Sequence, residues 1–252
     1  MNADAGRLRD IEAVEQRVRL PGTSAVVRLD GRGFSRLTKE TATLDRPFDV
    51  GFRDAMIGTA SHLFECGFRV EFGYTQSDEI SILLHVDDDA FGGRIDKALS
   101  VLAGEASAAL SLRLGMHAVF DARLLQLARE EDVVDYFVWR SLDAHRNALS
   151  AHAYWILRDR DGLTATAATQ RLDGAGVAEK NELLFERGVN FNEIPAWQKR
   201  GVALFWEDFE KVGVDPRTGD ARTAARRRVA VDVDLPLGEE WRSYLRQRVK
   251  PG

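Results

Sequence analysis

Two short acidic motifs constrain this chain most, because each joins a run of strand-forming residues to a carboxylate. In 26–34 an apolar run leads into Asp30, and in 74–83 Asp78 and Glu79 come just before another apolar run. The stretch between the motifs leaves room for one helix and one further strand. Neighbouring strands that end or begin on acids can place carboxylates a few ångströms apart. Mg²⁺ favours such oxygen ligands and usually shares them with substrate phosphates. The pair therefore predicts a site for a nucleotide and a divalent metal.

The elements expected in the first half follow the order of a ferredoxin-like α+β fold. Strands are expected at 25–29, 68–74, 80–86 and 117–127, and helices at 48–66 and 96–114. Strand, helix, strand, strand, helix, strand is the split βαβ arrangement. Its helices cover one face of an antiparallel sheet, and we expect the other face to be open for substrate. On this order Asp30 leaves the first strand, and Asp78 and Glu79 occupy the turn of the central hairpin.

The second half of the chain reads mainly as helix. A long helix is expected at 132–159, short helices at 164–172 and 177–185, and strands at 201–205 and 226–233, the last one pairing near 205–212. At the other end of the chain, residues 7–19 are charged and compatible with a helix. No linker separates the halves. We therefore expect a catalytic core at 1–130 and a helical extension with C-terminal strands at 131–252, packed on the core or continuous with it.

Composition narrows the class of protein. The 252 residues are 44% hydrophobic and 30% charged, which is ordinary for a soluble globular protein with a sizeable core. No apolar run approaches the roughly 18 residues that cross a membrane, and the first twenty residues lack the apolar centre of a signal peptide. Cys66 is the only cysteine, which excludes disulfides within the chain and a cysteine-rich zinc site. A reducing cytoplasm is the expected location.

The net charge of −5 counts against a nucleic-acid binder, because such proteins are usually basic. Binding needs only a local patch, however, so the objection is weak. The candidate patches are Lys199 with Arg200, and the group Arg222, Arg226, Arg227 and Arg228. Solvated surface arginines are an equally good interpretation of both.

The turn after Asp30 is rich in glycine, and exposed amides in such a turn can cradle a triphosphate. The turn residues that would take this role are Gly31, Arg32, Gly33 and Phe34. A plain Asp-Gly turn is the competing interpretation, since such turns are common. The presence of the second motif favours the functional one.

The segment 76–79 sets four polar residues between two apolar strands. A hairpin turn explains the polarity, but it explains the adjacent acids Asp78 and Glu79 less well, because turns favour Asn or Asp with Gly. Neighbouring carboxylates raise each other's pKa unless a cation neutralises them. Two metal ions about 3.5–4 Å apart could hold a triphosphate, activate an attacking hydroxyl and stabilise the leaving pyrophosphate.

Several other polar or aromatic positions are candidates for substrate contact. Arg46 offers a cation near the first motif, and arginine pairs well with phosphate oxygens. His145 and Asn147 lie on the expected long helix, where a lone histidine is more often structural. Lys180 and its neighbour open an apolar run, where a capping or surface role competes. Trp139 or Trp155 as a base-stacking platform is the less favoured alternative to a core role.

The motifs taken together resemble those of the histidine-tRNA guanylyltransferase family and its bacterial and archaeal relatives, the 3′-to-5′ nucleotide polymerases. The matching stretches are 28–32 with Phe34, 76–79, 135–136 with 139–140, 143–147, 162–164, 180–185 and 190–193. Each stretch alone is weak, but all of them occur in the family's order between about residues 25 and 206. Ala148 stands where the family motif often has asparagine, which favours a relative that repairs truncated 5′ ends against a template.

The resemblance implies a polymerase-type palm with a helical extension, and addition of nucleotides to the 5′ end of a tRNA. The 5′ phosphate would be activated with GTP or ATP and then attacked by the 3′ hydroxyl of an incoming nucleotide. The implied ligands of two Mg²⁺ ions are Asp30, Asp78 and the backbone carbonyl of Gly31, with Glu79 as the adjacent catalytic acid. Nucleotide contacts are implied for Arg46, Ser77 and Lys180, and tRNA contacts for His145, Asn147 and Asn181. The family is typically tetrameric, so a homotetramer or a dimer is expected.

Two other functions fit the same residues. A nucleotide cyclase or dinucleotide synthase would use the same palm and acid pair on GTP without RNA. A non-catalytic RNA-binding module would use the open sheet face, although carboxylates without a cation repel phosphate.

Overall fold

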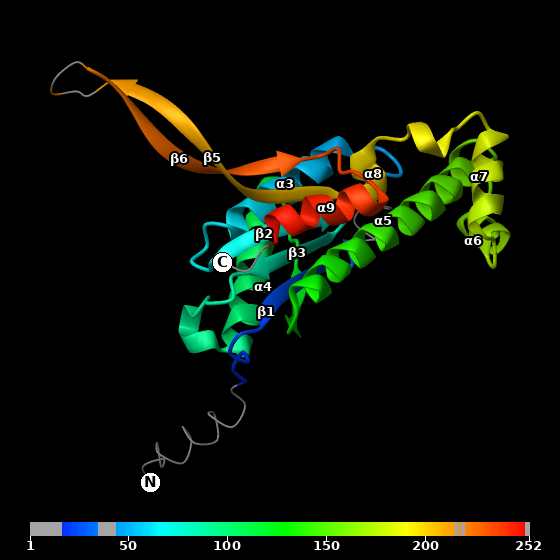
Figure 1. The fold of residues 1–252 in the computed structure, drawn as a ribbon. Helices are drawn as coiled ribbons and strands as arrows, with labels where there is room; N and C mark the ends of the chain where they lie inside the picture. Colours follow the sequence, from blue (N-terminus) through cyan, green and yellow to red (C-terminus); the bar gives the residue numbers. More distant parts are fainter. Residues whose placement is uncertain (1–16, 35–43, 215–216, 218–219, 250–252) are drawn as a thin grey trace, which may run out of the picture.

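The computed structural model describes residues 17–34, 44–214, 217 and 220–249 (Figure 1). Most of the helix expected at 7–19 lies outside these residues. Among the described residues, no helix combines the length and the apolar character that crossing a bilayer requires.

A six-stranded antiparallel sheet in the order β4-β1-β3-β2-β5-β6 forms the centre of the molecule (Figure 1). Its strands are β1 (Ser24–Gly31), β2 (Val70–Gln76), β3 (Glu79–Leu84), β4 (Phe120–Leu127), β5 (Val202–Val214) and β6 (Ala221–Asp232). The helices α3 (Val50–Leu63) and α4 (Ile95–Leu114) connect the first four strands, with the short turn η1 (Ala90–Gly93) before α4. This is the split βαβ order. The predicted ferredoxin-like α+β class is therefore confirmed, with the expected elements in place.

The strand β1 shows why the sheet has two buried faces. Ala25, Val27 and Leu29 point into the core shared with α3 and α4, whereas Val26 points into a second core on the opposite face. Successive strand residues alternate between faces, so an unbroken apolar run indicates burial on both sides. At the end of the strand this pattern stops, because Arg28 and Asp30 take the positions that follow Val26 on the second face.

Two helices of the second half cover that second face over the central strands. The first part of α5 (Glu130–Asp159) and the whole of α9 (Gly238–Arg248) pack there, with Phe137 against Phe72 and Trp241 against Tyr74. The expectation of an open face is therefore wrong for this part of the sheet. Among the described residues, the polar ends of β1 and of the β2–β3 hairpin stay accessible to a substrate.

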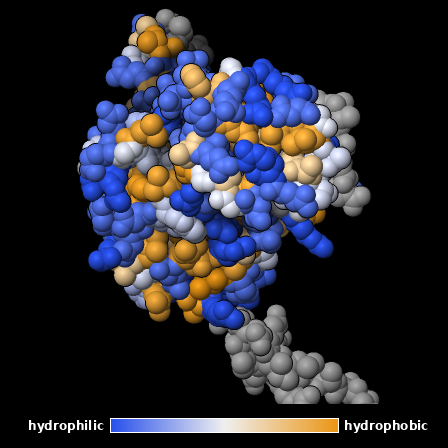
Figure 2. All heavy atoms as spheres, turned by 90° about the vertical axis from the view of Figure 1, so that its right-hand side faces the viewer, coloured by the Kyte–Doolittle hydropathy of each residue, from blue (hydrophilic) through white to orange (hydrophobic). Residues whose placement is uncertain are grey.

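The second part of α5 carries a separate helical layer away from the sheet (Figure 1). It consists of α6 (Ala165–Leu172), α7 (Val177–Phe185) and η2 (Phe191–Glu193). The short helix α8 (Ala196–Arg200) follows and reaches the sheet, where Tyr74 and Gln76 of β2 donate to its carbonyls. The first two were expected, whereas α8, α9 and the single turn η2 were not. Seen from this end, hydrophobic side chains gather in several separate patches between hydrophilic ones (Figure 2).

The strands β5 and β6 form a long ribbon that leaves the body of the molecule (Figure 1). Only the first residues of β5, Val202–Phe205, pair with β2, and beyond them the two strands pair with each other alone. The predicted strands at 201–205 and 226–233 are thus the inner part of a longer hairpin. Because β5 pairs with β2, strands of both halves of the chain share one sheet. The predicted division of the chain into two units at residue 130 therefore stays a prediction.

Candidate active site

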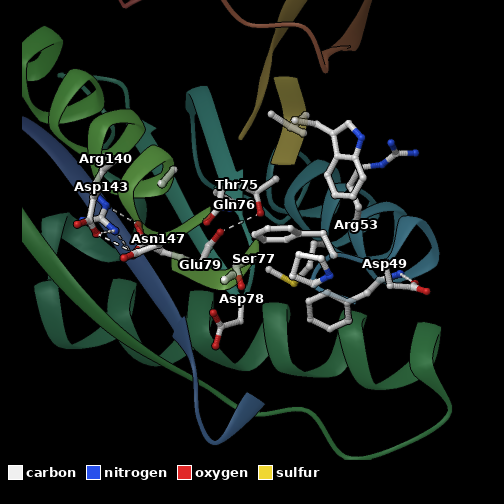
Figure 3. A pocket seen from close by; sticks show the side chains of 18 of the residues that line it. Asp49, Arg53, Thr75, Gln76, Ser77, Asp78, Glu79, Arg140, Asp143 and Asn147 are labelled. Atoms are coloured by element: carbon white, nitrogen blue, oxygen red, sulfur yellow. Dashed lines mark hydrogen bonds and ion pairs between the residues drawn. The ribbon is translucent and has the colours of Figure 1, made fainter. Parts of the chain in front are cut away.

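A cavity of about 600 Å³ opens where β1, the β2–β3 hairpin, the start of α3 and the middle of α5 meet (Figure 3). Arg140 and Asp143 of α5 lie on one side of the hairpin, and Asp49, just before α3, and Arg53 of α3 lie on the other (Figure 3). The predicted site residues that line it are Asp30, Arg46, Ser77, Asp78, Glu79 and Asn147. Its size is within the range of small-molecule sites in proteins.

The backbone brings Asp30 and Asp78 together. Asp30 is opposite Glu79 in the antiparallel pairing of β1 with β3. One residue further, the Gly31 N–H donates to the Asp78 carbonyl at 3.0 Å, which fastens the hairpin turn to the end of β1. Ser77 in that turn has a φ of 55°, a region that non-glycine residues rarely occupy. Such local strain is concentrated at functional sites.

The two aspartates have no arginine to neutralise them, since neither forms an ion pair with any residue that the structure describes. Burial raises the pKa of Asp78, and the nearby charge of Asp30 raises it further. The charged form of Asp78 is therefore less stable here than in water. A bound cation would relieve both effects.

These donors fit Mg²⁺. Carboxylate oxygens are hard ligands, and Mg²⁺ is usually held by one or two carboxylates with phosphates and water completing its shell. The described residues contain no group of three or more His, Cys, Asp or Glu side chains that could hold a metal alone. Water or a bound triphosphate would therefore have to supply the rest of the coordination.

Glu79 lies beside this pair but in a different environment. Arg140 of α5 donates from Nε to Oε1 and from Nη2 to Oε2 of Glu79, both at 2.7 Å. Arg28 adds a third contact at 3.7 Å. Burial raises the pKa of Glu79, and these two arginines oppose the rise. These hydrogen bonds anchor α5 to β3, which is a structural role. A direct catalytic role of Glu79 stays a prediction.

The turn 31–34 is built around the Phe34 ring. The ring is 3% exposed and makes edge contacts with Phe52 and Phe120, at centroid distances of 6.2 and 5.4 Å. A Cβ on Gly31 would lie 2.4 Å from this ring, so only glycine fits there. Arg32 and Gly33 are exposed and lie outside the cavity lining. The Phe34 side chain thus belongs to the core, and contacts of Gly31, Arg32 and Gly33 with a triphosphate stay predictions.

Aromatic rings and arginines form the end of the cavity beside α3. Phe48, Trp155 and Trp197 line it. The guanidinium of Arg46 lies 4.3 Å from the ring centroid of Trp155, and that of Arg53 lies 4.7 Å from the centroid of Trp197. Arg46 is thus placed at the cavity, as the sequence predicted.

The remaining predicted residues lie on the outer side of α5. His145 packs edge-on against Phe191 at 5.3 Å, and burial, followed by the charges of Lys199 and Arg200, lowers its pKa. On α7, Lys180 donates to Ser150 at 3.1 Å. Its neighbour Asn181 donates to the Val177 carbonyl within the helix. None of the three predicted residues lines the cavity, whereas exposed Asn147 does.

Sequence reasoning missed several residues that shape the site. Asp49 caps α3 by accepting from the Phe52 N–H at 2.7 Å, and Gln76 donates to the Gln198 carbonyl at 3.2 Å. Arg28, Arg53, Arg140, Asp143 and Trp197 also line the cavity without having been assigned a role. One signal was available, because Arg28 and Asp30 share a strand face. The partners from α3 carried no such signal, whereas Arg140 and Asp143 of α5 lie in stretches that match the family, although no role was assigned to either.

A ferredoxin-like core that presents an acid pair at its strand ends, beside a cavity of this size, has the architecture of a palm-type nucleotidyltransferase. A family model described as tRNAHis guanylyltransferase matches residues 5–128, and one described as the Thg1 C terminal domain matches residues 131–233. The chain belongs to the tRNAHis guanylyltransferase family. The resemblance drawn from the motifs is therefore confirmed, and a cyclase or dinucleotide synthase is not favoured.

Individual relatives agree with this assignment. A probable tRNA(His) guanylyltransferase of Mus musculus is 30% identical over 244 residues, covering 89% of this chain and 82% of the relative. One of Drosophila melanogaster is 32% identical over 194 residues, covering 73% and 68%. A bacterial tRNA(HIS) guanylyltransferase (Thg1)-like protein in complex with ATP superposes with a TM-score of 0.75 at 26% identity. The alignment covers 98% of this chain and 99% of that structure. A bacterial Thg1-like protein in complex with GTP gives a TM-score of 0.73 at 27% identity, with the same coverage.

Proposed function

We propose that this protein adds nucleotides in the 3′-to-5′ direction to the 5′ end of a tRNA, with Asp30 and Asp78 holding two Mg²⁺ ions. The observation that carries the proposal is the close approach of two carboxylates that no described cation neutralises. When bound, Mg²⁺ would stabilise charge on the phosphates and favour ionisation of an attacking hydroxyl. The family membership and the nucleotides in the titles of both bacterial relatives support the substrate class.

The chain's own groups would position the triphosphate. Exposed Ser77 and the guanidinium of Arg46 both line the cavity and can donate to phosphate oxygens. The backbone of 31–33 and the Gly31 carbonyl adjoin Asp30, where they can meet the same phosphates or a metal ion. Lys180 reaches α5 at Ser150, one helical turn from Asn147, and would act from the rim.

The tRNA would contact surfaces outside the cavity. Arg226, Arg227 and Arg228 on β6 are exposed on the ribbon, and they offer charge to a phosphate backbone. Asn147 at the cavity and Asn181 on α7 are further candidates, whereas His145 would act by holding the Phe191 turn. Ala148 is fully buried under the helical layer, so this departure from the family motif affects packing and not a substrate contact.

We also propose a homotetramer, or a dimer, located in the cytoplasm. The family resemblance motivates the assembly, and the single free cysteine, Cys66, motivates the location. Light scattering of the purified protein measures the assembly directly, and a monomer at working concentration would refute it.

The decisive experiment offers 5′-labelled tRNA, either complete or lacking its first nucleotide, with each nucleoside triphosphate in turn. We expect Mg²⁺-dependent extension by at least one nucleotide, and no extension with EDTA or by an Asp78→Asn variant. Extension only of the shortened tRNA would identify templated repair, whereas addition to the complete tRNA would identify a guanylyltransferase. A cyclic or dinucleotide product from GTP alone, without tRNA extension, would refute the proposal.

A further inference from the structure

Trp139 is an aromatic side chain that remains 46% exposed where it lines the catalytic cavity. The structure describes all five tryptophans, and Trp139 is the only one of them that is exposed. Tryptophan is on average highly buried in folded proteins. An exposed indole in a substrate cavity therefore calls for a ligand with a flat apolar surface.

Two neighbours on α5 fix the orientation of this indole. Tyr136 meets it edge-on, with centroids 5.9 Å apart, and the Tyr136 hydroxyl is hydrogen-bonded to Ser81 of β3 at 2.8 Å. The guanidinium of Arg140 lies 4.6 Å from the ring centroid and is itself held by Glu79. The ring is thus held between side chains that are themselves bonded to β3 before any ligand binds, which lowers the entropy lost on binding.

The position of Trp139 separates it from the aromatic end of the cavity. Trp155 lies sixteen residues further along the same helix, which corresponds to about 24 Å at 1.5 Å per residue. One nucleobase therefore cannot contact both rings. A reaction that joins two nucleotides needs a place for a base on either side of the reacting phosphate. Trp139 contacts Arg140, which binds Glu79, and Arg28 reaches the same glutamate at 3.7 Å.

We propose that Trp139 is a stacking platform for a nucleobase on the Arg28 side of the carboxylates. Every base has a π-face, so a tryptophan can stack on it whatever the sequence, and Arg28 lies nearby to balance the phosphate charge. The base belongs either to a nucleoside triphosphate or to the 5′ end of the RNA. This assignment rests on the proposed function, since it assumes a nucleotide substrate.

The test compares Trp139→Leu, which keeps an apolar side chain, with Trp139→Phe, which keeps a smaller aromatic ring. We expect the leucine variant to raise one KM about tenfold, the order expected for losing one base–aromatic stack, and the phenylalanine variant to retain most of the affinity. A higher KM for tRNA alone identifies the RNA base, and a higher KM for the triphosphate alone identifies the nucleotide base. Unchanged KM values for the leucine variant, or equal losses in both variants, would overturn the assignment.

Leu142→Ala is the matched control, because Leu142 lies on the same helix, is 56% exposed and does not line the cavity. Its KM values should equal those of the unmodified protein.

Tryptophan fluorescence supplies a second measurement, which detects binding without catalysis and does not require the leucine variant. Triphosphate or a 5′-phosphorylated RNA duplex should quench the unmodified protein more than Trp139→Phe. If each ligand quenched the unmodified protein and the Trp139→Phe variant equally, the stacking proposal would be overturned. If the protein shows this difference in quenching but adds no nucleotide to tRNA, the proposed function is refuted and the stacking proposal stands.

Discussion

The acids at the edge of this sheet occur in two contrasting environments, although Asp78 and Glu79 are neighbours in the sequence. Glu79 is bound by Arg140 through two hydrogen bonds of 2.7 Å, so its charge is neutralised within the protein. Burial raises the pKa of both acids, but arginines oppose the rise only at Glu79, whereas at Asp78 the charge of Asp30 adds to it and only hydrogen bonds oppose it. The difference teaches that an acid's environment distinguishes its role. A carboxylate that an arginine of the fold has neutralised builds structure, and one that has no described cationic partner is available for a metal ion.

Replacing Asp30 or Asp78 by asparagine should have the largest effect on activity, and it tests the contrast between the two kinds of acid most directly. We expect Asp30→Asn or Asp78→Asn to lower kcat by at least about a thousandfold, because metal-ion stabilisation of transition-state charge amounts to several kcal/mol. Steady-state kinetics at saturating Mg²⁺ and triphosphate measures the loss.

The same variants should unfold at no lower temperature than the unmodified protein when metal is absent. Asparagine removes a desolvated charge from Asp78 while keeping its shape, so the folded state loses a repulsion. Calorimetry in EDTA provides this control. A marked drop in melting temperature would show that Asp78 has a structural role, and activity near the unmodified level would exclude it as a metal ligand.

Glu79→Gln should show the opposite balance between stability and activity. Glutamine cannot accept both hydrogen bonds from Arg140, which is only 9% exposed. We expect unfolding to become easier by about 2 kcal/mol, less than for a fully broken buried pair, since Asp143 remains 3.2 Å from Arg140. Urea denaturation measures this change. Unchanged stability with a thousandfold loss of kcat would place Glu79 with the metal-binding acids after all.

The pH dependence of metal binding should sharpen the contrast further. A raised pKa means that a proton competes with the metal for Asp78 at a higher pH than for an ordinary aspartate, whose pKa is 3.8. We expect Mg²⁺ affinity to fall as the pH decreases toward the raised pKa, starting at a higher pH than for an ordinary aspartate. The fall should approach tenfold per pH unit once the pH is below that pKa. Calorimetric titration at several pH values tests this, with Asp78→Asn as the variant that should bind weakly and with less dependence on pH.

The sequence predicted the first half of the fold and the acid pair because both depend on local patterns. Alternation and unbroken apolar runs identified β1 to β4, and an acid at the end of one run and before another identified Asp30 and Asp78. The pairing of Glu79 with Arg140 could not be predicted from local patterns, because Arg140 lies 61 residues away in the sequence on a helix that crosses the sheet. The cover on the second face was missed for a similar reason. Trp241 and Leu245 form a helical stripe on α9, but nothing local shows which sheet face that stripe covers.

The smallest expected effect lies at the outer end of the charged chain that begins at Glu79. Arg146 contacts Asp143 at 3.0 Å, but its side chain is 57% exposed, so water solvates the charge in the folded and unfolded states alike. Arg146→Ala should therefore change the free energy of unfolding by less than about 0.5 kcal/mol, against about 2 kcal/mol for Glu79→Gln. Urea denaturation at low and high salt measures both variants, and only the small contribution of Arg146 should disappear with salt. Equal losses of unfolding free energy in the two variants would mean that solvent exposure does not determine how much each ion pair stabilises the fold. The contrast between Glu79, neutralised by a buried arginine, and Asp78, available for a cation, would then lose its physical reason.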